Sequence, residues 1–74
     1  MQTRQHDILK LLRVKGSCGV DFLARRLGVS EMTIRRDLRT LEADARIVRI
    51  HGGATLAERV AFEFSFLQRR AKTR

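Results

Sequence analysis

Three arginines lie close together in the middle of the sequence, in a spacing that suits contact with a nucleic acid. Arg35 and Arg36 are adjacent, and Arg39 follows three residues later. A guanidinium can bond two acceptors on the edge of a guanine or clamp a phosphate, because its donors form a rigid fork. Side chains with hydroxyl, thioether and carboxylate groups surround them, so the candidate DNA-contacting set of this stretch is Ser30, Glu31, Met32, Thr33, Arg35, Arg36, Arg39 and Thr40.

A second candidate set follows closely along the chain. Arg46, Arg49 and His51 would supply positive charge or hydrogen-bond donors, and Gly52 and Gly53 form a strong two-residue turn signal. The alternating residues around this turn predict a β-hairpin, which can reach the backbone or the minor groove beside a helix that lies in the major groove. For Arg49 and His51, the alternative is an ordinary solvated face of the hairpin.

The pattern of apolar residues predicts the elements that must position these side chains. Helices are expected at residues 4–15, 21–27 and 31–44, and the strands of the hairpin at residues 46–51 and 54–56. Gly16 ends the first helix, and the side chains of Asp21 and Ser30 are expected to cap the second and third helices. Residues 17–20 connect the first two helices, with room for one extended pair of residues.

The third helix is expected to present its arginines away from the core. Ile34, Leu38 and Leu41 form one apolar stripe, and a rotation of about 100° per residue places Arg36 nearly opposite that stripe. The N-terminal end of such an outer face is where a recognition helix contacts base edges in the major groove. The alternative is a solvated helix surface whose arginines pair with the acidic residues Glu31, Asp37 and Glu42.

The composition restricts the classes of protein to which the chain can belong. Its 74 residues suffice for one small domain, and 16 Lys and Arg against 8 Asp and Glu give a net charge of +8. Such an excess predicts a polyanionic partner, nucleic acid first and an anionic membrane surface second. No apolar run approaches the roughly 20 residues of a membrane helix, and no signal peptide is recognisable, so we expect a cytoplasmic protein with no membrane partner.

The sequence offers no residue set typical of catalysis, of a disulfide or of a metal site. The sequence shows no paired-carboxylate pocket, no nucleophile with a suitable base and no glycine-rich phosphate loop, so an enzyme is not expected. The single cysteine, Cys18, cannot form an internal disulfide and suits the edge of a core. Cys18, His6 and His51 cannot form a zinc-ligand set at a suitable spacing, so no metal or other cofactor is expected.

Residues 20–39 fit a helix-turn-helix unit of twenty residues. Ala24 stands at its fifth position, where a small residue lets two helices cross closely. Gly28 stands at its ninth, where the turn needs a residue that tolerates positive φ. Only the eighteenth position disagrees, because it holds Asp37 and the apolar residue follows one place later at Leu38.

The chain resembles the N-terminal domain of the DeoR family of bacterial sugar-metabolism repressors over residues 3–57. The resemblance rests on the runs 29–38, 41–42 and 49–54, together with Arg4, Ile8, Leu9, Gly16, Leu23 and Ala24. Two positions depart from the family pattern. Ala45 replaces a glycine at the exit of the third helix, where a positive φ would cost about 1 kcal/mol. Phe22 replaces a residue that is commonly acidic.

The resemblance implies a mainly α fold with a small β-hairpin, namely a winged helix-turn-helix with a three-helix core and a two-stranded wing. It divides the chain into a DNA-binding domain at residues 1–57, with its helix-turn-helix unit at 20–39 and its wing at 46–56, and a linker at 58–74. Glu63 and Arg69 resemble that linker. In the same segment Phe62, Phe64 and Phe66 alternate as in a strand, and they could mediate contacts between molecules.

The resemblance also implies a function, namely binding to a double-stranded DNA operator and repression of genes of sugar or carbohydrate metabolism. A C-terminal domain, absent here, would bind a phosphorylated sugar that relieves repression and would make the full-length protein a homo-oligomer. Glu31 and Met32 lie in the variable part of the family motif, so we expect them to help select the operator. The alternative function is a winged-helix module that contacts protein or RNA.

Overall fold

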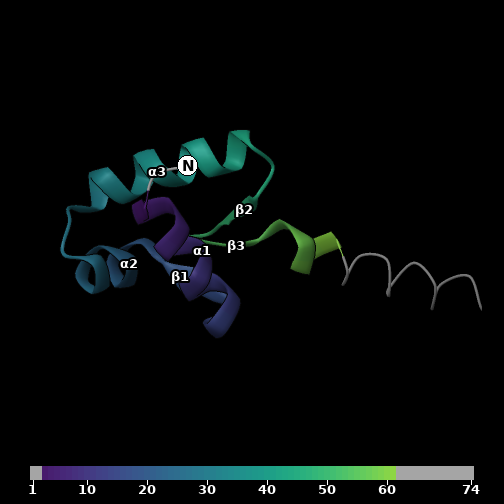
Figure 1. Cartoon of the computed structure of the whole chain (residues 1–74), viewed down its shortest axis with the longest axis horizontal. Helices are drawn as coiled ribbons and strands as arrows, with labels where there is room; N and C mark the ends of the chain where they lie inside the picture. Colours follow the sequence, from purple (N-terminus) through teal and green to yellow (C-terminus); the bar gives the residue numbers. More distant parts are fainter. Residues whose placement is uncertain (1–2, 62–74) are drawn as a thin grey trace, which may run out of the picture.

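The computed structural model describes residues 3–61, in which three helices pack against a small sheet (Figure 1). The elements in chain order are α1 (Thr3–Lys15), β1 (Ser17–Gly19), α2 (Val20–Leu27), α3 (Glu31–Ala43), β2 (Ile47–Ile50) and β3 (Gly53–Leu56). Residues 57–61 are helical. The winged helix-turn-helix architecture expected from the sequence is confirmed, whereas the alternation of Phe62, Phe64 and Phe66 lies outside the described residues.

The sheet has three strands where the sequence predicts a two-stranded wing. Its order is β1-β3-β2, and both pairings are antiparallel, with Cys18 opposite Ala54 in one and Arg49 opposite Ala54 in the other. The two-stranded wing is confirmed as β2 and β3, and the extended residues allowed between the first two helices form the additional strand β1. The sequence did not predict that β1 joins the sheet, because this segment is too short to show a period of its own. Its pairing with β3 depends on residues far away in the sequence.

Gly53 makes this third strand possible. A Cβ atom at Gly53 would lie 2.1 Å from the backbone oxygen of Cys18, a distance no side chain tolerates. Only glycine therefore lets β1 approach β3 this closely. Two further bonds fasten the sheet to its surroundings. The Val20 amide donates to the Gly52 carbonyl at 2.9 Å, and the Thr55 hydroxyl donates to the Gly16 carbonyl at 2.7 Å.

The core receives apolar side chains from each helix and from the sheet. The largest side chains with no exposed surface come from the three helices and are Ile8, Leu12, Leu23, Ile34, Leu38 and Leu41. Ile47, Ala54 and Leu56 cover them from the sheet side. The apolar stripe predicted for the third helix is therefore confirmed, and it fixes which side of α3 can face a partner.

The N-termini of the second and third helices are capped in different ways. Ser30 caps α3 as expected, since its Oγ accepts a hydrogen bond from the Thr33 amide at 3.1 Å. The expected Asp21 cap was wrong, because α2 begins at Val20 with Gly19 as its N-cap residue. The Asp21 carboxylate instead accepts from the amide of Phe22, inside the first turn.

The turn between α3 and β2 contains the positive φ that the glycine of the family pattern suggested. Ala45 has a φ of 60°, the only positive value among the non-glycine residues 3–61. The Ala45 amide donates to the Glu42 carbonyl and the Arg46 amide donates to the Leu41 carbonyl, both at 2.9 Å. These two bonds hold Ala45 in the left-handed region despite its Cβ. The sequence predicted both Arg46 and His51 to lie in a strand. This was wrong, because Arg46 belongs to this turn and His51 to the hairpin turn.

Candidate nucleic-acid interface

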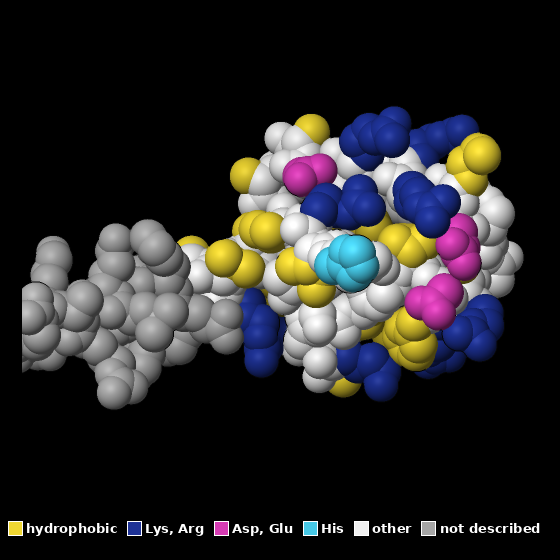
Figure 2. All heavy atoms as spheres, turned by 180° about the vertical axis from the view of Figure 1, so that it is seen from behind, with side chains coloured by type: hydrophobic (Ala, Val, Ile, Leu, Met, Phe, Trp, Pro, Cys, Tyr) yellow, Lys and Arg dark blue, Asp and Glu magenta, His cyan; other side chains and the backbone are white. Residues whose placement is uncertain are grey.

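One side of α3 is open to solvent along its whole length. The candidate residues exposed on it are Glu31, Met32, Arg35, Arg36, Arg39 and Thr40. Figure 2 shows Lys and Arg side chains along the upper edge of the molecule, where α3 lies in Figure 1, and also along the lower edge. Ile34, Leu38 and Leu41 are fully buried on the other side of the helix. The arginines of α3 therefore cannot turn inward without disrupting the core.

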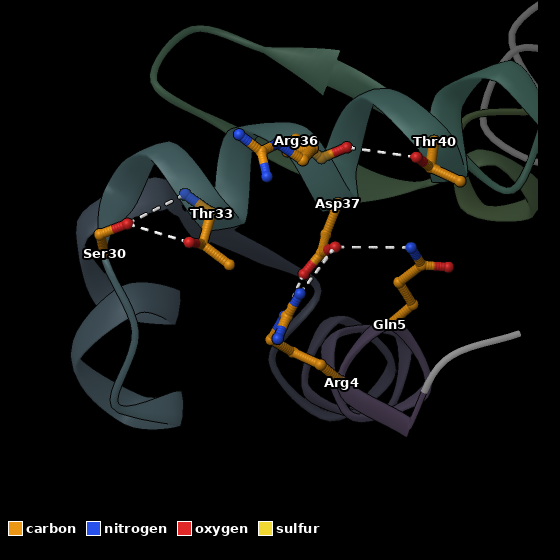
Figure 3. A network of polar contacts seen from close by, with 7 residues as sticks. All are labelled: Arg4, Gln5, Ser30, Thr33, Arg36, Asp37 and Thr40. Atoms are coloured by element: carbon orange, nitrogen blue, oxygen red, sulfur yellow. Dashed lines mark hydrogen bonds and ion pairs between the residues drawn. The ribbon is translucent and has the colours of Figure 1, made fainter.

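The first turn of α3 is held in shape by two hydroxyl side chains. The Ser30 and Thr33 hydroxyl oxygens lie 3.0 Å apart, in addition to the bond from the Thr33 amide to Ser30 (Figure 3). Both hydroxyl groups therefore already have partners within the chain. Their first role is to fix the start of the helix and the direction in which its exposed residues point.

The arginines of α3 differ in whether they have an acidic partner. Arg35 donates to the Glu31 carboxylate at 3.3 Å, an exposed pair one helical turn apart. The remaining ion pairs within residues 3–61 join Arg4 to Asp37 and Arg25 to Asp21. In that part of the chain Arg36 and Arg39 thus have no acidic partner. The alternative, in which the arginines pair with acidic residues on a solvated surface, therefore applies to Arg35 alone. Such an exposed pair contributes only about 0.3–0.5 kcal/mol to stability.

Asp37 points in the opposite direction and is buried, with 3% of its surface exposed. Its carboxylate accepts hydrogen bonds from Arg4 Nε, from Arg4 Nη2 at 3.3 Å and from Gln5 Nε2 at 3.4 Å (Figure 3). The hydrogen bond to Asp37 raises the pKa of Arg4 above its ordinary value. This network explains why the eighteenth position of the helix-turn-helix unit tolerates a carboxylate: a buried charge is retained where it is paired and hydrogen-bonded.

The Arg4–Asp37 contact ties the first turn of α1 to the middle of α3. Sequence reasoning missed it, although it had noted both the carboxylate at an apolar position and Arg4 in the family pattern. A buried acidic residue needs a cation, and that requirement was the signal that could have found it. The contact helps to hold α3 in place beneath its exposed face, so these two residues position the interface rather than form it.

The hairpin distributes its candidate residues between its surface and its interior. Arg46, His51 and Gly52 are exposed, whereas Arg49 is half-buried and its Nε donates to the Gly53 carbonyl at 3.4 Å. Gly53 itself is buried against β1. The exposed part of the hairpin therefore offers Arg46, His51 and the Gly52 backbone to a partner, and the half-buried Arg49 keeps the donors on its two terminal guanidinium nitrogens while its Nε bonds Gly53.

The described residues hold few features of other kinds of site. Cys18 is buried, its Sγ lies 3.9 Å from the Leu11 carbonyl oxygen, and burial raises the pKa of its thiol. Within residues 3–61, no three His, Cys, Asp or Glu side chains lie together as metal ligands would. None of the helices in that range is long and apolar enough to cross a membrane.

Comparison with known proteins gives a consistent result. Residues 4–60 match the model of the DeoR-like helix-turn-helix domain. The lactose phosphotransferase system repressor of Streptococcus mutans is 45% identical over 53 residues, which are 72% of this chain and 21% of that protein. The HTH-type transcriptional repressor CutR of Bacillus subtilis is 41% identical over 56 residues, or 76% of this chain and 30% of CutR. An uncharacterized HTH-type transcriptional regulator of Haemophilus influenzae is 38% identical over 60 residues, or 81% of this chain and 23% of the regulator.

The chain thus spans between a fifth and a third of the length of these relatives. No solved structure matches it. The relatives are named as transcriptional regulators and repressors rather than as enzymes.

Proposed function

Because the chain belongs to the DeoR family as a DNA-binding helix-turn-helix domain of a transcriptional regulator, we propose that α3 reads a specific double-stranded operator. The contacting residues are those exposed on α3 together with Arg46, Arg49, His51 and the Gly52 backbone, while Gly53 holds the turn against β1. Residues 1–57 form the DNA-binding domain, and residues 58–74 lead toward an effector-binding domain.

The single observation that carries this proposal is the two-sided character of α3. Its apolar stripe is fully buried, and on the exposed side Arg36 and Arg39 have no acidic partner within residues 3–61. A guanidinium without an internal partner can bond a guanine edge or a phosphate without first breaking a contact. The net charge of +8 adds the long-range attraction that nucleic acids exert on basic proteins.

We further infer that the output is repression of genes of sugar metabolism, relieved by a phosphorylated sugar. The relative from Streptococcus mutans, named a lactose phosphotransferase system repressor, supports this inference. The effector would bind to a domain beyond this chain, because 74 residues leave no room for a second core. That domain would also assemble a homo-oligomer, which would place two copies of α3 on half-sites related by two-fold symmetry.

Selection of binding sites from a random duplex library tests the proposal. We expect the 74-residue chain to enrich a defined motif. Its affinity for that motif should fall steeply with salt concentration, because the Lys and Arg side chains that contact phosphates release counterions condensed on the DNA. Structured RNA is added as a competitor, which distinguishes operator recognition from RNA binding. A chain that enriches no duplex motif, or that binds RNA as tightly as the selected duplex, would contradict operator recognition.

A further inference from the structure

Met32 is an exposed apolar side chain among polar residues at the N-terminal end of α3. Three large apolar side chains are exposed among residues 3–61, namely Val14 at 83%, Met32 at 68% and Ile50 at 42%. Val14 lies in α1 and Ile50 in β2, so Met32 is the exposed large apolar side chain of α3. It lies in the first turn of that helix, the part of a recognition helix that comes nearest to base edges.

The polar side chains around Met32 are already engaged with one another. The Ser30 and Thr33 hydroxyls share a contact at 3.0 Å, and Glu31 accepts from Arg35 at 3.3 Å. Arg36, four residues after Met32, has no acidic partner in the described residues, and side chains at that spacing are neighbours on a helix surface. The first two turns of α3 therefore present one free apolar group next to one free guanidinium.

The chemistry of a thioether limits what Met32 can recognise. It carries no hydrogen-bond donor and only a weak acceptor, so it cannot read the polar pattern of a base edge. The major groove of DNA displays one apolar group, the C5-methyl of thymine. Methionine is unbranched and polarizable, so it can adapt its shape to such a methyl group.

We propose that Met32 determines operator specificity by packing against the methyl group of one thymine, while Arg36 contacts the base or phosphate next to it. This assignment rests on the proposed function, because it requires α3 to enter the major groove. It adds the chemical group that is read and the residue that reads it. It also explains why an exposed methionine is compatible with a surface that otherwise carries charges and hydroxyls.

Replacing thymine with deoxyuridine removes only the methyl group and therefore tests the contact directly. In the duplex motif selected by the 74-residue chain, each dT is exchanged in turn for dU and the dissociation constant is measured. We expect one position at which the exchange weakens binding about three- to fourfold, the size expected for exposing one buried methyl group. The other dT positions should respond less.

Variants of Met32 assign that effect to its side chain. Met32→Ala should bind the dT and dU duplexes equally at the sensitive position, whereas Met32→Leu should keep most of the difference. Val14→Ala is the matched control, because it shortens another exposed apolar side chain on a different helix and should leave the difference intact. Thermal unfolding should show that all three variants are as stable as the parent, since neither side chain is buried.

The possible failures are distinguishable. A selected motif that is indifferent to dU at every position would overturn the role of Met32 and leave operator recognition standing. A sensitive position that remains equally sensitive in Met32→Ala would overturn it as well, because another residue would then contact the methyl group. The absence of any selected motif would instead refute the proposed function on which this inference rests.

Discussion

Arg36 and Asp37 are adjacent in the sequence and opposite in charge, and α3 places them in opposite environments. Asp37 is 3% exposed and is bonded to Arg4 and Gln5, whereas Arg36 is exposed and has no acidic partner among the described residues. A charge on the inward side must be paired, because desolvation is costly there. A charge on the outward side needs no partner and stays available for a ligand. The inward side of α3 thus serves the fold and the outward side serves recognition.

The largest effect should follow from opening the inward side. Leu38→Ala removes a fully buried side chain and should destabilise the fold by about 2–5 kcal/mol, through lost burial and the cavity that remains. Urea unfolding measures this, and Glu42→Ala, an exposed change on the same helix, is the control. An unchanged stability of Leu38→Ala would mean that the inward and outward sides of α3 have been exchanged.

A somewhat smaller loss of stability should follow from removing the inward charge. Asp37→Asn keeps the shape of the side chain but loses the ion pair with Arg4, and we expect a cost of about 1–3 kcal/mol in unfolding experiments. The double variant Arg4→Met/Asp37→Leu should regain much of it, because the Asp37 side is buried and apolar residues of similar size often replace an ion pair there without loss. Full stability of Asp37→Asn would show that the pair contributes nothing to the docking of α1 on α3.

The neighbouring outward charge should affect binding instead of stability. Arg36→Ala should weaken binding to the selected operator by about 1–3 kcal/mol and relax the preference at one base pair, while the melting temperature stays the same. Arg13→Ala, which removes one exposed charge from α1, controls for the loss of charge. If Arg36→Ala weakens binding equally on all duplexes, Arg36 contacts a phosphate rather than a base.

The smallest effect is expected at the exit of α3, where neither side is involved. Ala45→Gly relieves the cost of a positive φ in a residue with a Cβ atom and should stabilise the fold by about 1 kcal/mol. Thermal unfolding measures the gain, and operator affinity should not change. A loss of stability would show that the chain entropy added by glycine outweighs the relieved strain.

Local patterns were sufficient to predict much of this arrangement. The spacing of Ile34, Leu38 and Leu41 and the Ser30 cap depend on residues within one or two turns, and the structure confirms them. Such features follow from backbone geometry that neighbouring residues impose on each other.

Two features depend instead on residues that are distant in the sequence. The pairing of β1 with β3 joins Ser17 to Thr55, and the Arg4–Asp37 contact spans 33 positions. A period of two or of 3.6 residues carries no information about such partners. The exclusion of Asp21 from the cap has a different cause, because extending α2 back to Val20 leaves that residue inside the first turn.

The attachment of the hairpin to the start of α2 has a consequence for the thermodynamics of binding. The Val20 amide is bonded to the Gly52 carbonyl, and Gly53 lies flush against Cys18, so the tip of the hairpin shares a rigid frame with the helix-turn-helix unit. Ordering a loose arm on a ligand sacrifices conformational entropy, and a preorganised one largely avoids that penalty. The tip and the recognition helix should therefore engage the double helix as a single body, with their mutual spacing set before the encounter.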